Sequence, residues 1–269
     1  MPKENKSVFI TGASDPLGRQ LCYRFLEGGF RVKALKPPLK DQPWLKKLRD
    51  SIEWLEGGLL DLTTLEANLD DVQYVIHTAE LSSSRMRDKE EMYKTNIEGT
   101  ANIVNVCLSK SIERFCHISS LSALGSDQAS ARVDEYQKWQ SSDKHSPYAV
   151  SKYQAELEVW RAQAEGLPIL VLNPAVLIGP GDWTSHPACQ MFKYVWEESA
   201  YYRPESFDYV DVRDAADITY QLLQTNIQNS KFIIKAGGLT FKSFYEQVIG
   251  NIGRIPYVHI VKRLRSVIS

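Results

Sequence analysis

The sequence predicts an α/β fold built on a doubly wound, mainly parallel sheet. Short β-rich runs alternate with longer amphipathic stretches along most of the chain, which is typical of β-α-β units. No linker rich in Ser, Gly or Pro divides the 269 residues into separate folding parts. Hydrophobic residues make up 43% of the chain and charged residues 24%, a composition that indicates a folded globular protein and excludes disordered and collagen-like classes.

The individual elements follow from this alternation. The β-rich runs predict strands at residues 7–10, 31–35, 52–56, 74–77, 114–119 and 169–172. Apolar residues at three- and four-residue spacing predict helices at residues 17–27, 62–69, 90–110 and 147–165. Right-handed crossovers between parallel strands then place helices on both faces of the sheet.

The turn after the first strand has features of a phosphate-binding site. Gly12 and Gly18 lie where glycines let backbone N–H groups approach a pyrophosphate at a helix N-terminus. Asp15 stands where the middle glycine of such a turn belongs. Asp15-Pro16 is also a good helix start, in which the carboxylate would take the N–H groups that a phosphate needs. The turn is therefore either a dinucleotide site or an ordinary strand-turn-helix junction.

The residue after the second strand bears on the choice of nucleotide. An acidic residue there binds the ribose 2′-hydroxyl of NAD, whereas a basic residue accommodates the 2′-phosphate of NADP. The residue after the strand at 31–35 is Lys36, followed by two prolines. The sequence thus favours NADP over NAD, with a solvated strand-end lysine as the alternative.

A tyrosine and a lysine lie four residues apart at a predicted helix start. Tyr148 and Lys152 would share one helical face, where an ammonium group lowers the pKa of a phenol and produces an acid/base that works near neutral pH. Such a pair also occurs by chance on many helices. One strand earlier, Ser119, Ser120 and Ser122 lie at the carboxyl edge of the sheet, where ligands of doubly wound folds bind.

Taken together, several stretches resemble the extended short-chain dehydrogenase/reductase superfamily, which contains nucleotide-sugar epimerases and dihydroflavonol-reductase-like enzymes. Besides the nucleotide turn, the similar stretches are residues 75–79, 96–102, 114–120 with Gly125, 147–152, 173–181 and 209–215. The resemblance runs over nearly the whole chain. It implies a Rossmann-type fold with a small C-terminal substrate subdomain.

The resemblance also implies a role for particular residues. Tyr148 would be the proton donor and acceptor, and Lys152 would lower its pKa and hold the nicotinamide ribose. Ser120, with Ser122 as a fallback, would orient the substrate oxygen, and Asn96 would brace the active-site helix. The implied cofactor-binding residues are Gly12, Ser14, Asp15, Pro16, Leu17, Gly18, Lys36, Leu59, Thr78, Ala79, Tyr148, Lys152, Pro174 and Val176.

Four departures from the family pattern lie on the nucleotide side. Besides Asp15, Gly58 stands where the family usually has an aspartate that meets the adenine. Glu80 replaces a small residue, and Pro37 falls where reductase-like members often carry Arg. The catalytic side is intact, which indicates an unusual or weakened cofactor site.

The expected domain organisation follows the motifs. Residues 1–181 would form the dinucleotide-binding Rossmann core, residues 182–208 an irregular, aromatic-rich substrate or lid segment, residues 209–230 a return to the core, and residues 231–269 the C-terminal substrate subdomain. If the aromatic side chains of the lid segment face the cleft, they favour an apolar or aromatic substrate. Packing within the subdomain is the alternative.

The leading functional hypothesis is an NAD(P)-dependent oxidoreductase that interconverts a carbonyl and a secondary alcohol. A nucleotide-sugar epimerase or dehydratase is one alternative, and a non-catalytic NAD(P)-sensing or scaffold protein is another. The 32 basic and 33 acidic residues favour a small-molecule substrate over nucleic acid or a membrane. Cys22, Cys107, Cys116 and Cys189 show no metal-ligand spacing, so we expect reduced thiols, a cytoplasmic location and no metal. A homodimer through the helices at 90–110 and 147–165 is expected from the resemblance.

Overall fold

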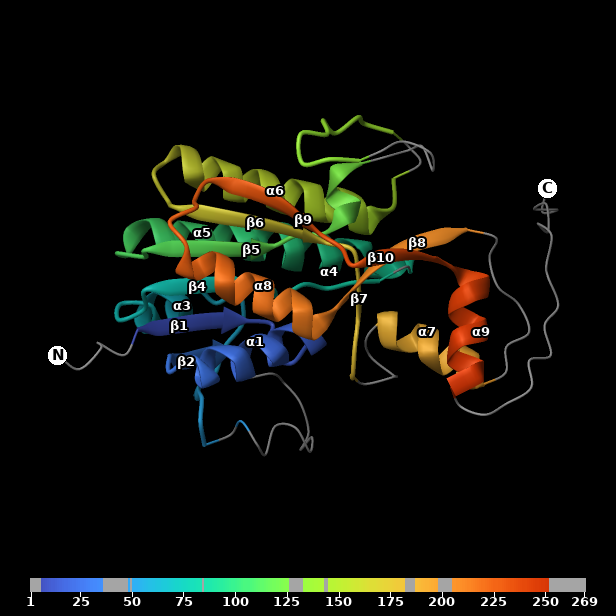
Figure 1. Cartoon of the computed structure of the whole chain (residues 1–269). Coiled ribbons are helices and arrows are strands. Elements are labelled where there is room, and N and C mark those ends of the chain that lie inside the picture. The colour runs from blue at the N-terminus through green and yellow to red at the C-terminus, as the bar shows by residue number, and fades with distance from the viewer. Residues whose placement is uncertain are drawn as a thin grey trace.

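The predicted fold class is confirmed. The computed structural model of the chain (Figure 1) describes residues 6–35, 48, 50–83, 85–125, 133–142, 145–181, 187–197 and 205–251. Its centre is a seven-stranded sheet in the order β3-β2-β1-β4-β5-β6-β9. Every neighbouring pair in this sheet is parallel. The strand order reverses between β1 and β4, and ligands of doubly wound folds bind at the carboxyl ends of the strands beside such a point.

Six of the seven strands correspond to the predicted ones. The strands are β1 (Ser7–Thr11), β2 (Arg31–Leu35), β3 (Glu53–Leu55), β4 (Tyr74–His77), β5 (Arg114–Ile118), β6 (Ile169–Pro174) and β9 (Ser230–Ile234). All residues of β1, β4 and β6 are buried, because helices cover both faces of a parallel sheet. β9 adds an edge strand that the apolar pattern did not single out. It begins one residue before the predicted start of the C-terminal subdomain.

Helices cover the two faces of the sheet, as predicted. One face carries α1 (Pro16–Glu27) and α8 (Val212–Gln224), which lie side by side in Figure 1. The other carries α3 (Leu62–Asn68), α5 (Gly99–Ser109) and α6 (Pro147–Ala164). Alternate residues of β1 serve the two cores: Val8 and Ile10 pack toward α1 and α8, and Phe9 packs toward α5 and α6.

The predicted helix at 90–110 is interrupted by a π-helical turn. It consists of α4 (Lys89–Tyr93), the π-helical turn at Lys94–Glu98 and α5, and a 3-10 turn at Met86–Asp88 precedes it. Asn96 is the buried residue of the π-helical turn. Such turns are frequent at functional sites because they redirect a side chain without ending the helix.

The expectation of an irregular lid segment was wrong in part. α7 (Pro187–Trp196) lies within it, and β8 (Ser206–Asp211) begins there. β8 pairs with β7 (Val176–Ile178) and β10 (Gly237–Thr240), and α9 (Phe241–Asn251) packs beside α7, as Figure 1 shows. Trp183, Tyr201 and Tyr202 lie outside the described residues.

The aromatic side chains of this region mainly pack against one another. Phe244 on α9 meets Phe192 at 5.0 Å and Phe207 at 5.7 Å between ring centroids, both edge to face. Val195 and Tyr245 complete this small core. The described aromatic residues therefore fit the packing alternative, although Tyr194 and Trp196 are exposed.

Three further observations concern cysteines, metals and membranes. All four cysteines are buried, and none of them is in a disulfide bond. In the described part of the chain, no three His, Cys, Asp or Glu side chains gather in a way that could hold a metal ion. Over the same residues, no helix combines the length and the apolar character that a bilayer crossing requires. The absence of a metal and the cytoplasmic location stay predictions.

Candidate functional site

The turn between β1 and α1 requires glycine at two positions. Gly12 has a φ of +71°, and a methyl group there would lie 2.7 Å from the Ala79 backbone nitrogen. A methyl group at Gly18 would collide with the Gly12 carbonyl oxygen. These contacts pack the turn closely against the end of β4. The glycine pattern is therefore the result of a tight turn and not of chance.

Asp15 occupies the expected helix start, but its carboxylate does not cap the helix. It is the N-cap residue of α1, and its own φ of −78° suits any side chain. Pro16 follows at the first helical position. The expectation that its carboxylate takes the first N–H groups was wrong, because the side chain accepts no capping hydrogen bond. The Asp15 side chain therefore leaves the N-terminus of α1 uncapped.

A Gly18→Ala substitution is expected to destabilise the protein by about 1–3 kcal/mol, because the added methyl group forces a backbone shift in a closely packed turn. Gly58→Ala is the matched control, since a methyl group at Gly58 meets no atom within 4 Å. Urea unfolding of both variants measures the difference. Equal stability of the two variants would contradict the tight turn.

A cavity of about 610 Å³ opens in front of this turn. Its volume is in the range of small-molecule sites. It is lined by Gly12, Ala13, Ser14, Asp15, Leu35, Gly57, Gly58, Leu59, Leu60, Asp61, Ala79, Glu80 and Thr95. The lining contains three carboxylates and, among the described residues, neither Lys nor Arg.

The structure brings together only part of the predicted cofactor set. The predicted residues that line the cavity are Gly12, Ser14, Asp15, Leu59 and Ala79. Pro16, Leu17, Gly18 and Thr78 are buried next to it. Pro174 ends β6 and Val176 begins β7, away from the lining. Lys36 and Pro37 lie outside the described residues. The lining residues that the prediction missed include Leu35, the last residue of β2, and Gly57 and Leu60, which follow β3.

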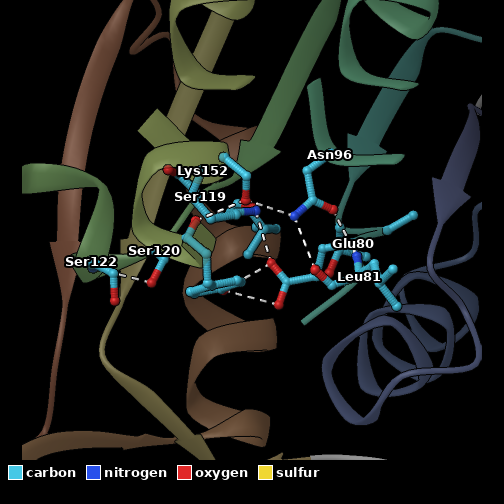
Figure 2. Close-up of polar contacts among 12 residues, drawn as sticks. Glu80, Leu81, Asn96, Ser119, Ser120, Ser122 and Lys152 are labelled. Carbon is cyan, nitrogen blue, oxygen red and sulfur yellow. Dashed lines mark hydrogen bonds and ion pairs between the residues drawn. The ribbon is translucent and has the colours of Figure 1, made fainter. Parts of the chain in front are cut away.

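Tyr148 and Lys152 meet at the carboxyl end of the sheet, and a third side chain joins them. The Tyr148 hydroxyl donates to Glu80, 3.0 Å from each carboxylate oxygen. The Lys152 ammonium lies 2.9 Å from Glu80 Oε2 and 2.9 Å from the Ile118 carbonyl oxygen (Figure 2). The side chain of Lys152 is 3% exposed, and that of Glu80 is 25% exposed. Glu80 thus holds both members of the predicted catalytic pair.

The surroundings of Tyr148 keep its phenol protonated. Burial and then the negative charge of Glu80 raise the pKa of Tyr148 well above its usual value. A hydrogen bond with the Ser120 hydroxyl acts in the opposite direction. Ser122 is exposed, and its backbone N–H donates to Ser120 Oγ at 3.2 Å (Figure 2). Ser120, and not the fallback Ser122, is therefore the serine that contacts Tyr148.

Asn96 links two chain segments behind the pair. Its amide donates to Ser151 Oγ and to the Leu81 carbonyl oxygen, both at 3.0 Å. Its own oxygen accepts from the Leu81 N–H at 2.7 Å (Figure 2). These bonds fix α6 and the segment that carries Glu80. Asn96 has the bracing position that the resemblance implied.

A buried histidine connects the end of β1 with the first turn of α5. His77 Nδ1 lies 2.8 Å from the Thr11 hydroxyl, and Nε2 lies 2.9 Å from the Thr100 hydroxyl. Because Thr100 donates to the Asn96 carbonyl oxygen, Nε2 must carry the proton and Nδ1 must accept. Burial, followed by the charge of Lys152, lowers the pKa of His77 to about 3, so the ring stays neutral.

Glu156 is a buried carboxylate next to the segment that carries Ser119 and Ser120. Its Oε2 accepts from Ser119 Oγ at 2.8 Å and from Asn173 Nδ2 at 2.9 Å. Asn173 also donates to the Ser120 carbonyl oxygen at 3.0 Å, and Lys231 forms an ion pair with Glu156 Oε1. This network holds the backbone that carries Ser120. The sequence analysis missed it because its members come from four separate segments.

A nicotinamide dinucleotide fits this site in shape. The close approach of Gly12 to Ala79, the uncapped N-terminus of α1 and the cavity in front of them form the cradle that a pyrophosphate requires. Glu80, which lines the cavity, contacts the Tyr148 and Lys152 donors. The cradle also faces carboxylates, because Asp15, Asp61 and Glu80 line the cavity. Burial and the nearby Glu80 raise the pKa of Asp15 to about 7.

Comparison with known proteins agrees with this geometry. The model of the NAD dependent epimerase/dehydratase family matches residues 8–235. Cinnamoyl-CoA reductase 1 of Arabidopsis thaliana is 30% identical over 78% of this chain and 64% of its own length. A Synechocystis sp. protein provisionally named dihydroflavonol 4-reductase is 31% identical over 77% of this chain and 60% of its own length. The chain thus spans less than two thirds of the length of either relative.

A solved structure shows the same fold. The UDP-glucuronic acid 4-epimerase of Bacillus cereus, in complex with UDP-glucuronic acid and NAD, superposes with a TM-score of 0.83 at 19% identity. The match covers 96% of this chain and 87% of that one. With the family model matching most of the chain, the chain belongs to the NAD-dependent epimerase/dehydratase family, within the extended short-chain dehydrogenase/reductase superfamily.

Proposed function

We propose that the protein is an NAD(P)-dependent oxidoreductase that interconverts a carbonyl and a secondary alcohol. The observation that carries this proposal is the meeting of Tyr148, Lys152 and Ser120 at the carboxyl end of the parallel sheet. Family membership and the similarity to reductases support it.

Each of these side chains has a place in the chemistry. A nicotinamide dinucleotide bound in the cavity would supply the hydride-transfer chemistry at the substrate carbon. In the direction of reduction, the Tyr148 hydroxyl gives its proton to the substrate oxygen as the carbonyl electron pair moves onto that oxygen. The Lys152 ammonium stabilises the phenolate that remains, and the Ser120 hydroxyl orients the substrate oxygen. Asn96 and Glu156 position these groups through the backbone segments that they hold.

We further propose that NADP is preferred to NAD. Lys36 directly follows β2, where a basic side chain meets a 2′-phosphate and an acidic one binds a 2′-hydroxyl. A thermal-shift titration with NADPH, NADP⁺, NADH and NAD⁺ tests this preference. A ligand at about 100 times its Kd adds about 2.7 kcal/mol of stability, a shift of several degrees for a chain of this size. We expect the larger shifts from NADPH and NADP⁺.

The other outcomes of this titration separate the alternatives. Larger shifts with NADH and NAD⁺ would contradict the preference but not the oxidoreductase. A shift without turnover on any carbonyl substrate would favour the sensing or scaffold protein. A UDP-sugar that stabilises the protein further would favour the epimerase or dehydratase that the family name also includes.

The expected homodimer and cytoplasmic location complete the proposal. The helices at 90–110 and 147–165 would form the dimer interface, and the exposed Leu157 on α6 supplies an apolar group for it. Analytical ultracentrifugation measures the assembly. A monomer at all concentrations would contradict it.

A further inference from the structure

Glu80 occupies the two hydrogen-bond donors that the proposed reaction uses, the Tyr148 hydroxyl and the Lys152 ammonium. It is the third residue after β4 and lines the cavity beside Ala79. Its carboxylate accepts the Tyr148 hydroxyl on both oxygens and forms the ion pair with Lys152. The phenol and one face of the ammonium are therefore already engaged. In the proposed function these same two groups hold the nicotinamide ribose and the substrate oxygen.

The charges around Glu80 come from several elements. Lys152 and Tyr148 face it from α6, and Asp15 faces it from the start of α1. Behind Lys152, His77 on β4 and His117 on β5 are buried rings whose pKa values are lowered by burial and by the Lys152 charge. Lys152 is thus the one cation among these groups, and Glu80 neutralises it.

We propose that Glu80 is an internal competitor of the cofactor, which controls affinity by occupying the Tyr148 and Lys152 donors until a dinucleotide displaces its carboxylate. This inference rests on the proposed function. The displaced carboxylate has room, because Glu80 borders the cavity and is partly exposed, whereas Lys152 is buried. Glu80 is therefore the member of the ion pair that moves.

Displacement also changes the acid/base. The Glu80 carboxylate is one of the causes that keep the pKa of Tyr148 high. When the cofactor replaces it, the phenol loses a neighbouring anion while Lys152 stays in place. Cofactor binding and readiness of Tyr148 for proton transfer are thus coupled through one side chain.

Two variants test this role. Glu80→Ala removes the competing carboxylate. Glu80→Gln keeps the size of the side chain and removes only its charge, and it serves as the second variant if the protein does not fold with a small side chain next to the buried Lys152. Calorimetric titration with NADPH and NADP⁺ is expected to give at least about tenfold lower Kd values for Glu80→Ala, equal to about 1.4 kcal/mol, and a smaller gain for Glu80→Gln. Glu91→Gln on α4 is the control, because it removes one exposed negative charge away from the site.

A second readout does not depend on the cofactor. The tyrosinate absorbance of the cofactor-free protein is titrated in the ultraviolet, and the titration of the matching Tyr148→Phe protein is subtracted to isolate Tyr148. We expect a lower pKa for Tyr148 in Glu80→Ala than in the wild type. If the wild type binds the cofactor and both Glu80 variants bind it equally well or more weakly, the inference about Glu80 is wrong but the proposed function still stands. No binding of any nicotinamide dinucleotide by the wild type or either variant would overturn the proposed function, and the inference with it.

Discussion

Tyr148→Phe is expected to lower kcat by at least about 100-fold, because general acid/base catalysis contributes about 10²–10⁴-fold to such reactions. The ring stays in place, since Phe lacks only the hydroxyl that contacts Glu80 and Ser120. Cofactor affinity should change little. The variant keeps Lys152, which would hold the ribose, and loses only one of the two contacts that hold Glu80. Steady-state kinetics and cofactor titration of the same preparation measure both quantities.

Tyr153→Phe is the matched control on the same helix. The Tyr153 ring stacks on Trp139 with centroids 4.3 Å apart, and the substitution keeps that stack. We expect kcat close to that of the wild type. Retention of most of the activity by Tyr148→Phe would refute its assignment as the acid/base, whereas equal losses in both variants would indicate damage to α6 as a whole.

The central sheet was predictable because its signal is local. β1, β4 and β6 are short apolar runs, and both the burial and the parallel pairing of such runs follow from the intervening helices. The Tyr148 and Lys152 pair was predictable for the same reason, since four-residue spacing on a helix places two side chains together. Both of these predictions depended on the pattern within one segment.

The features that decide how the site works depend on distant segments. Glu80 reaches Lys152 from 72 positions away, a separation that no periodicity reveals. The π-helical turn at Lys94–Glu98 lies inside a helical pattern that continues across it. Asp15 was placed correctly as a helix start, but neither the missing side-chain cap nor the effect of the Glu80 charge on its carboxyl could be predicted from the turn alone.

Cofactor affinity is expected to fall as the pH rises through about 7. Burial and then the Glu80 charge raise the pKa of Asp15 from 3.8 to about 7. Below that pH the carboxyl is neutral and tolerates the negative pyrophosphate, and above it a second anion stands in front of the helix N-terminus. If cofactor binding is coupled to the uptake of one proton by Asp15, the Kd of the cofactor rises by up to about tenfold per pH unit above the Asp15 pKa. Calorimetric titration of NADPH between about pH 6 and pH 9 measures this slope.

Asp15→Asn is expected to remove most of this slope, because an amide does not ionise. The same substitution has a consequence for stability that needs no cofactor. A carboxyl whose pKa is raised on folding contributes stability that is complete below about 3.8 and is lost as the pH rises through about 7. Asp15→Asn should therefore gain stability over the wild type as the pH rises, with exposed Asp50→Asn as the control for loss of one charge. Parallel pH curves of stability for the wild type and Asp15→Asn would show that Asp15 is already ionised in the folded protein, and the predicted slope in affinity would then have another source.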